Sequence, residues 1–431
     1  MRVGMAMVGS RGDVQPFVAL GHALRAAGHE VTVTANADAA DLVAAAGARF
    51  VPFDLDVHEM LSSREGQRLL ANGKTRQFLD FANRSLGEVR DSAGKGVLAA
   101  AEGADVLVAG VGMDDYALAA SQYLGVPVVL GYLAPWLPSA EYPQIMMYKA
   151  ALLPGSLGGR ANSLSHRVTE WVHWRGRREQ VNAFRRSLGL PAANGSIVTR
   201  AARLGTPALL AYSGAVCPRA HDWHPDSAPT GYWLLPPQAR ARLGESEPSR
   251  ELTDWLGSGD PPVFIGFGSM PILDPAPLIE AATEAAGLAG VRVLLGAGWT
   301  ELAKAGVALP EYVRLTGDVD HDWLFPRCRA VIHHGGTGTT GAGLTAGRPT
   351  WIYSLFFDQP FWGTRVRRLG VGGHSRFRDM RARPLAEVMR RLAGEDIRQR
   401  ASALGDQLSR EDGVAAAVTA VTRVSQAAAS R

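Results

Sequence analysis

The first half of the chain alternates between short apolar runs and segments with helical spacing. The run RVGMAMV is followed by VQPFVALGHALRAAG, in which apolar residues recur every three or four positions until a glycine ends the pattern. Further apolar runs, HEVTVTAN, DVLVAG and PVVLGYL, are separated by helical segments such as YALAASQYLG. Strands and helices that alternate in this way predict a parallel, doubly wound sheet.

The same rhythm restarts after residues 217–237, a proline-rich stretch without periodicity. The later apolar runs include PPVFIGFGSM, VRVLLGAG, CRAVIHH and RPTWIYS. We therefore predict an α/β protein with two Rossmann-like domains, over residues 1–216 and 238–410, that face each other across a cleft. The stretch 217–237 is the predicted linker, and residues 411–431 form a C-terminal helix or tail. In such sheets ligands bind beyond the carboxyl ends of the strands.

Composition narrows the class of protein. A chain of 431 residues is too long for one core, and its 46% hydrophobic and 20% charged residues are typical of a globular protein. It has no leader-like start and no apolar run of the roughly 18–20 residues that a membrane span needs, so we expect a cytoplasmic protein. Cys217 and Cys328 lack metal-type spacing. The net charge of +4 is small for this length and the arginines are dispersed except in WRGRREQVNAFRR, so the composition argues against nucleic-acid binding.

The segment AVIHHGGTGTTGAGL, residues 330–344, carries the strongest chemical signal. It reads as a strand, two histidines and a glycine-threonine loop that opens a helix. Free amides at a helix N-terminus bind diphosphates, and His334, Thr339 and Thr340 could add side-chain donors. A glycine-rich turn with capping threonines is the structural alternative.

Several motifs together resemble the family 1 GT-B nucleotide-sugar glycosyltransferases, closest to the branch of the sterol and glycopeptide-antibiotic glycosyltransferases. The motifs are GSRGDVQPFVALG, NAFRRSLGLP, PPVFIGFGSM, WLFPRCRAVIHHGGTGTT and DQPFWGTRVRRLGVG. The chain departs from that branch at Thr337, where alanine is common, and at GVGGH, where proline often follows GVG. The resemblance implies the GT-B fold and a C-terminal segment that packs back on the first domain.

The resemblance also implies a donor site. The residues that would hold the donor diphosphate are Ser10, Gly268, Ser269, His334, Gly336, Thr337, Gly338, Thr339 and Thr340. Asp358 and Gln359 match the acid-glutamine pair that grips hydroxyls of the donor sugar, a role that suits a carboxylate beside an amide. An N-cap for the following helix is the alternative role of Asp358. We expect no metal and no cofactor besides the nucleotide sugar.

Asp13 is the candidate catalytic base. Many relatives have histidine at the matching position of the first loop, and here the loop reads GDVQP. A carboxylate is ionised at neutral pH and can accept a proton from an acceptor hydroxyl late in the reaction. The alternative is that Asp13 only caps the helix that follows.

The aromatic and apolar insertions at 55–100 and 131–190 indicate the chemical class of the acceptor. Candidate contacts are Tyr132, Trp136, Met146, Met147, Trp171 and Trp174, although Trp171 and Trp174 also fit core packing. We expect inverting transfer of a hexose from a UDP- or dTDP-sugar to a hydrophobic natural product, such as a polyketide, aromatic compound or peptide antibiotic. A sterol or lipid glucosyltransferase using UDP-glucose is the alternative, and a lipid acceptor would imply peripheral membrane contact.

Two other classes of protein compete with this interpretation. A nicotinamide-linked dehydrogenase requires G-x-G-x-x-G after the first strand, and GSRGDVQ breaks that pattern. A catalytically inactive nucleotide-sugar-binding protein stays open, because binding motifs outnumber catalytic ones. We expect a monomer or a dimer.

Overall fold

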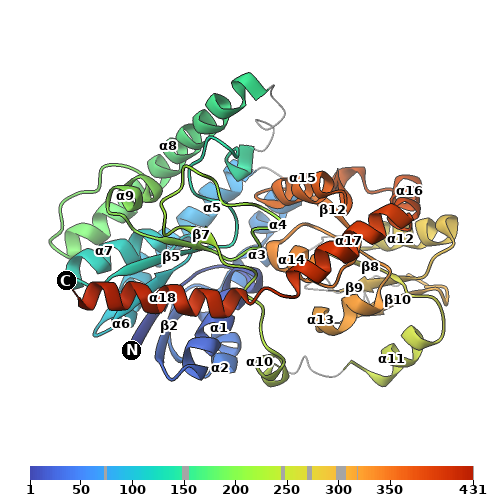
Figure 1. Ribbon diagram of the computed structural model, residues 1–431, viewed down its shortest axis with the longest axis horizontal. Coiled ribbons are helices and arrows are strands. Elements are labelled where there is room, and N and C mark those ends of the chain that lie inside the picture. The colour runs from blue at the N-terminus through green and yellow to red at the C-terminus, as the bar shows by residue number, and fades with distance from the viewer. Residues whose placement is uncertain are drawn as a thin grey trace. The chain divides into compact units, whose positions relative to one another are not determined.

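The computed structural model describes residues 1–71, 75–147, 155–243, 248–268, 274–297, 307–317 and 319–430. They form two units, each built round its own sheet (Figure 1). The first unit comprises Met1–Met60, Arg76–Ala239 and Asp412–Arg431, and the second Leu61–Thr75 and Arg240–Glu411. The α/β class predicted from periodicity is confirmed.

The first unit holds a seven-stranded parallel sheet in the order β3-β2-β1-β4-β5-β6-β7. Its central strands are buried along their length, which explains why they read as continuous apolar runs. The strands are β1 Arg2–Ala6, β2 Glu30–Asn36, β3 Arg49–Phe53, β4 Val106–Ala109, β5 Val128–Tyr132, β6 Ala208–Leu210 and β7 Ala228–Pro229.

Helices connect these strands, and some of them are long insertions. Helix α1 buries a stripe that includes Val14, Phe17 and Leu24, and Phe17 meets Trp233 edge-on at a centroid distance of 5.5 Å. The helices of this part of the chain are α1 Arg11–Ala26, α2 Ala40–Ala46, α3 Val57–Ser62, α5 Thr75–Glu88, α6 Arg90–Ala101, α7 Asp114–Leu124, α8 Gly155–Ser187 and α9 Ile197–Arg203.

Residues 217–237, the predicted linker, lie within the first unit. They supply strand β7 and the buried side chains of Trp223 and Trp233, so their lack of periodicity reflects an irregular edge of the sheet. The boundary between the units follows Ala239, inside helix α10 (Pro237–Arg242).

Helix α18 (Gly413–Ala429) also belongs to the first unit and packs against α1 and β4. Its first residue lies so close to the backbone of Gly231 and Tyr232 that only glycine fits there. Together, β7 and α18 show that the first unit is completed by two late segments of the chain.

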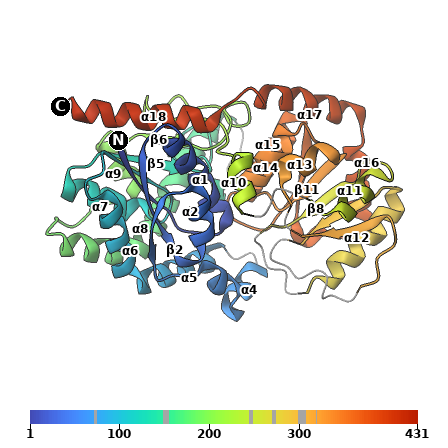
Figure 2. The same ribbon diagram turned by 90° about the horizontal axis from the view of Figure 1, so that it is seen from below.

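The second unit holds a six-stranded parallel sheet in the order β10-β9-β8-β11-β12-β13. Alternate residues of its strands face opposite layers of helices. Ile265 and Ile332 pack with α12 and α16, whereas Phe264 and Val331 pack with α11, α13 and α14 (Figure 2). Helices on both faces make this sheet doubly wound. The strands are β8 Val263–Gly266, β9 Val293–Gly296, β10 Val313–Thr316, β11 Ala330–His333, β12 Thr350–Ser354 and β13 Gly372–Arg376.

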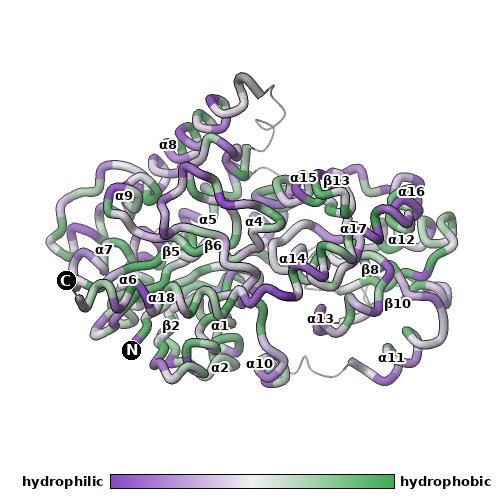
Figure 3. The backbone as a smooth tube through the Cα atoms, in the orientation of Figure 1, coloured by the Kyte–Doolittle hydropathy of each residue, from purple (hydrophilic) through white to green (hydrophobic). Residues whose placement is uncertain are grey.

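The helices of the second unit complete this layer structure. They are α4 Arg64–Ala71, α11 Arg250–Gly257, α12 Ala276–Ala289, α13 His321–Leu324, α14 Thr337–Thr345, α15 Gln359–Leu369, α16 Ala382–Leu392 and α17 Glu395–Leu408. Hydrophobic residues concentrate in the strands and hydrophilic ones on the outer helices (Figure 3). No helix in the described part of the chain has the length and hydropathy needed to cross a lipid bilayer.

Candidate active site

The loop after β11 brings two histidines to the carboxyl end of the second sheet. His333 is completely buried, and its Nδ1 accepts a hydrogen bond of 3.0 Å from the backbone N–H of Gly335. The ring proton must therefore lie on Nε2. Gly335 has φ of +102°, and a Cβ at this position would lie 2.6 Å from Ile352. Glycine is thus required where the chain turns from the strand into the helix.

His334 lies over the beginning of α14. A Cβ on Gly336 would stand only 2.6 Å from His334 Nε2, and one on Gly268 would stand 3.1 Å from its Cε1. These two glycines therefore leave the space that the imidazole occupies. Burial lowers the pKa of His334 to about 4, so the ring is neutral at pH 7. Its Nδ1 is buried without a hydrogen-bond partner among the described residues, so this nitrogen is available for a hydrogen bond to a ligand.

The first turn of α14 presents backbone amides, and the Thr340 hydroxyl is not available beside them. Gly336 is the N-cap, and the helix begins at Thr337. The N–H groups of the first turn therefore have no carbonyl acceptor within the helix. Thr340 differs from the sequence-based expectation, because its fully buried hydroxyl donates to the Gly336 carbonyl at 2.8 Å. That hydroxyl supports the helix and is not turned to a ligand. Ser269 lies outside the described residues.

Asp358 stands at the start of α15 but does not cap it through its side chain. Its Oδ2 instead accepts two hydrogen bonds, from the Trp362 indole at 2.8 Å and from the Thr337 hydroxyl at 3.1 Å. Burial raises the pKa of Asp358, and these two hydrogen bonds oppose that rise. The preceding residue, Phe357, has φ of +53°, a strained conformation for a residue other than glycine.

Gln359 uses its carboxamide oxygen within the loop that precedes α15. Its Oε1 accepts the backbone N–H groups of Leu355 at 2.8 Å and Phe356 at 3.3 Å, and its side chain is buried. The carboxamide oxygen therefore holds the loop that leads to Asp358. Trp362 and this loop were missed by the sequence-based reasoning, although Trp362 lies one helical turn after Asp358.

In the first unit, Asp13 occupies the third position of α1 and closes a capping box. Its Oδ2 accepts from the backbone N–H of Ser10 at 2.9 Å and from the Ser10 hydroxyl at 3.1 Å. The hydroxyl of Ser10 is thus directed at Asp13. The carboxylate is nevertheless exposed, so capping leaves it accessible to a substrate.

Asn36, at the end of β2, fixes the loop that carries Asp13. Its Oδ1 accepts from the Gly9 N–H at 3.0 Å, and its Nδ2 donates to the Gly9 carbonyl at 3.1 Å. Gly9 has φ of +144°, and a Cβ there would overlap Asp13. Sequence reasoning did not identify Asn36, because this contact joins residues 27 positions apart.

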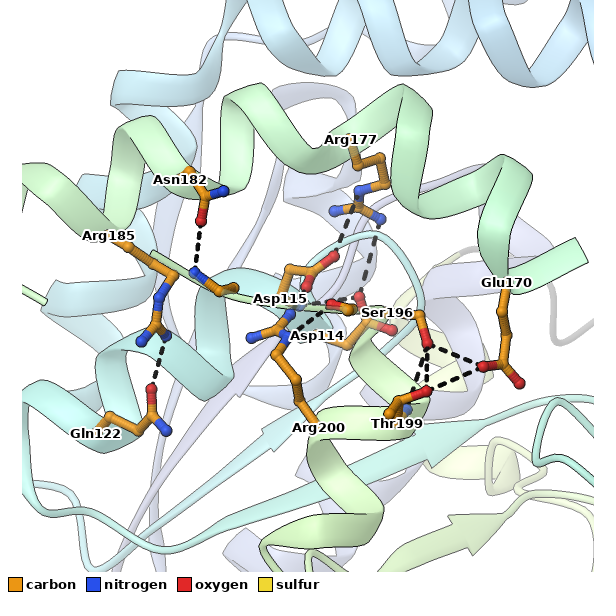
Figure 4. A network of polar contacts seen from close by, with 12 residues as sticks. Asp114, Asp115, Gln122, Glu170, Arg177, Asn182, Arg185, Ser196, Thr199 and Arg200 are labelled. Atoms are coloured by element: carbon orange, nitrogen blue, oxygen red, sulfur yellow. Dashed lines mark hydrogen bonds and ion pairs between the residues drawn. The ribbon is translucent and has the colours of Figure 1, made fainter. Parts of the chain in front are cut away.

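A buried charge network connects the insertion helix α8 to helices α7 and α9 of the first unit (Figure 4). Arg177 of α8 lies 3.9 Å from Asp114 and 3.5 Å from Asp115, and Arg200 pairs with Asp115. Burial and the charge of Asp115 raise the pKa of Asp114 to about 6. These residues hold α8 at the carboxyl end of β4.

The candidate acceptor residues lie in different environments. Tyr132 is fully buried and donates to Asp114 at 3.4 Å, so it is an interior residue and not part of an open acceptor surface. Trp136 is partly buried beside the ring of His173. Trp171 and Met147 are exposed, and Trp174 and Met146 are partly buried. Exposure of Trp171 argues against a core role for that side chain.

Two parallel sheets with a glycine-rich phosphate-type loop at the carboxyl end of the second one indicate a nucleotide-binding α/β protein. Comparison with known proteins identifies the class of protein more closely. Residues 3–130 match the glycosyltransferase family 28 N-terminal domain, and residues 299–420 match the erythromycin biosynthesis protein CIII-like C-terminal domain. The sterol 3-beta-glucosyltransferase UGT80B1 of Arabidopsis thaliana is 32% identical over 98% of this chain and 68% of its own length.

A sterol 3-beta-glucosyltransferase of Debaryomyces hansenii is also 32% identical, over 96% of this chain but only 26% of its own length. Among solved structures, the glycotransferase of kitacinnamycin has a TM-score of 0.71 at 21% identity, with 98% of both chains covered. The calicheamicin glycosyltransferase CalG4 has a TM-score of 0.65 at 18% identity, with 100% of both chains covered. The chain belongs to the family 1 GT-B nucleotide-sugar glycosyltransferases, in the branch related to the sterol glucosyltransferases, and is an enzyme of that class.

Proposed function

We propose that this glycosyltransferase moves a hexose, with inversion, from a UDP- or dTDP-sugar to a hydroxyl of a hydrophobic acceptor. The observation that carries the proposal is the hydrogen bond between Thr337 and Asp358. It joins the first residue of the phosphate-type helix to a carboxylate suited to sugar hydroxyls. A diphosphate-binding group and a hydroxyl-binding group therefore lie side by side, as a nucleotide sugar requires.

In the proposed reaction the donor diphosphate leaves from the anomeric carbon. The amides of Thr337, Gly338 and Thr339 and the ring of His334 stabilise the negative charge that develops on it. Because His334 is neutral, it acts as a hydrogen-bond donor and not as a fixed cation. Asp358 has Oδ2 committed to Thr337 and Trp362, so Oδ1 is the oxygen proposed to accept a sugar hydroxyl.

Asp13 is the proposed general base. As the sugar becomes cation-like, the acceptor oxygen attacks the anomeric carbon and its proton passes to the Asp13 carboxylate. Ser10 holds that carboxylate through its N–H and hydroxyl, and Asn36 fixes the loop behind it. The proposal thus gives Asp13 both of the roles that its sequence position suggested, capping and catalysis.

A sterol with UDP-glucose is the first substrate pair to test, because the relatives that match over nearly all of this chain are named sterol 3-beta-glucosyltransferases. A natural-product aglycone is the second candidate. It is supported by the match of residues 299–420 to the erythromycin biosynthesis model.

The test is a transfer assay with UDP-, dTDP- and GDP-glucose, each offered with a sterol and with a phenolic polycyclic acceptor. We expect a β-glucoside from an α-linked donor with at least one pair, measured by NMR of the product. Retention of configuration would contradict inversion. Tight donor binding with neither transfer nor hydrolysis would instead indicate a nucleotide-sugar-binding protein.

Asp13→Asn tests the role of the base. Asn can still accept the Ser10 N–H, so we expect an unchanged melting temperature and unchanged donor affinity, but a 10²–10⁴-fold lower kcat, the usual range for general-base catalysis. Asp13→Ala is the comparison, since it removes both cap and base. If Asn restored full transfer while Ala did not, capping would be the only role of Asp13.

A further inference from the structure

Helix α8 exposes a stripe of apolar side chains along one side. Leu164, Val168, Trp171 and Val172 are 58%, 42%, 60% and 36% exposed. They follow one another at spacings of four, three and one positions, and at 3.6 residues per turn these spacings place all four on the same side of the helix. We call this side the outer face of α8.

The opposite side of α8 attaches the helix to the first unit. Arg177 and Phe184 are buried there, and they lie roughly 200–220° round the helix from Leu164 at about 100° per residue. In Figure 1 the amino-terminal part of α8 extends beyond the sheet of this unit. The outer face therefore does not pack in the core of the first unit, because the opposite side of α8 makes that contact.

Arginines border the apolar stripe. Arg160, Arg167, Arg175 and Arg178 are exposed, and no carboxylate within the described ranges lies at ion-pair distance from them. Arg175 stacks on Trp171 with its guanidinium 5.0 Å from the ring centroid. Two acidic residues lie among these arginines along the helix: Glu170 already accepts from Ser196 and Thr199, and Glu179 is exposed. The four arginines therefore outnumber the carboxylates on this part of α8.

We propose that the outer face of α8 docks the protein on an anionic lipid bilayer. Leucine, valine and tryptophan side chains enter the boundary between headgroups and acyl chains, while flanking arginines pair with lipid phosphates, as in other interfacial helices. A second copy of the chain fits this face less well, because a two-fold contact would bring the same arginines together. The proposal rests on α8 and does not depend on the identity of the acceptor.

A site-specific probe tests the proposal on the full chain. Cys217 and Cys328 are both buried, so a cysteine introduced by Leu164→Cys can be labelled selectively with an environment-sensitive fluorophore. We expect a blue shift with vesicles of phosphatidylglycerol and phosphatidylcholine, a weaker shift at high salt, and none with phosphatidylcholine alone. The control is Leu204→Cys, an equally exposed leucine of the same unit (54%), which should show no shift.

Co-sedimentation with the same vesicles provides the second test. Arg167→Glu with Arg175→Glu, and separately Trp171→Ser, should each lower partitioning by about tenfold or more, without changing the melting temperature. The matched control is Arg203→Glu with Leu204→Ser, which should bind like the wild type. Equal binding by all variants, no binding to anionic vesicles, or a dimer that Trp171→Ser dissociates would overturn the proposal.

Discussion

At the scale of single residues, Thr337 links the two parts of the donor site. Its backbone begins the phosphate-type helix, and its hydroxyl donates to Asp358, whereas alanine is common at this position in the branch that the sequence resembles. Thr337→Val should lower kcat/KM for the donor by roughly tenfold, because a hydrogen bond to a charged group contributes about 1.5–3 kcal/mol and Trp362 still holds the carboxylate. Affinity for the free nucleoside diphosphate should change little.

The pH profile separates positioning from general damage in this variant. A hydrogen bond to the ionised carboxylate lowers its pKa, so loss of the Thr337 donor should raise the pKa of Asp358 further and move the acid limb of kcat/KM to higher pH. Thr337→Ser keeps the hydroxyl and should restore the wild-type profile. A Val variant with wild-type donor kinetics would show that Thr337 does not position Asp358.

At the scale of elements, the docking of α18 depends on Gly413. A Cβ there would stand 2.4 Å from the backbone carbon of Gly231 and 2.5 Å from the Tyr232 carbonyl oxygen. Gly413→Ala should therefore displace the start of α18 and destabilise the first unit by about 1–3 kcal/mol, the usual cost of overpacking. Chemical denaturation followed by circular dichroism measures this change. Ala416→Ser, on the exposed side of α18, is the control, and equal stability of the two variants would exclude tight docking.

At the scale of the whole molecule, buried histidines make stability sensitive to acid. Burial lowers the pKa to about 4 for His173, His334 and His374, and it lowers the pKa of His166 and His333 as well. The unfolded chain binds these protons near pH 6.5 and the folded chain does not. The stability that they contribute is therefore complete above pH 6.5 and is lost as the pH falls towards 4.

A smaller set of carboxyl groups acts in the opposite direction, because burial raises the pKa of Asp114 to about 6 and also raises the pKa values of Asp322 and Asp358 above the unfolded value of 3.8. Protonation of this set stabilises the folded chain as the pH falls. With five histidines against it, we expect lower stability at pH 5.0 than at pH 7.5, measured by denaturant titration at both. His374→Gln should reduce this difference, since it removes one contribution. Equal stability at the two pH values would show that the histidines are not buried as neutral rings.

The sequence by itself determined the class of fold and the location of the glycine loops. Apolar runs that alternate with helical segments are local patterns, and a strand buried on both faces must read as apolar, so two parallel sheets could be predicted. The positions of Asp13, His334 and Asp358 in the segments that lead from a strand into the next helix follow from the same reasoning. These residues could be chosen before any contact was known.

The tertiary structure alone decided what each side chain contacts. Thr337 meets Asp358 across 21 positions, and Asn36 meets Gly9 across 27, distances along the chain that no local pattern encodes. The same holds for Tyr132, whose aromatic ring fits an acceptor site by composition but lies inside the first sheet. A residue's type limits the bonds it can make, whereas the folding of distant segments decides which partner is near enough to make them.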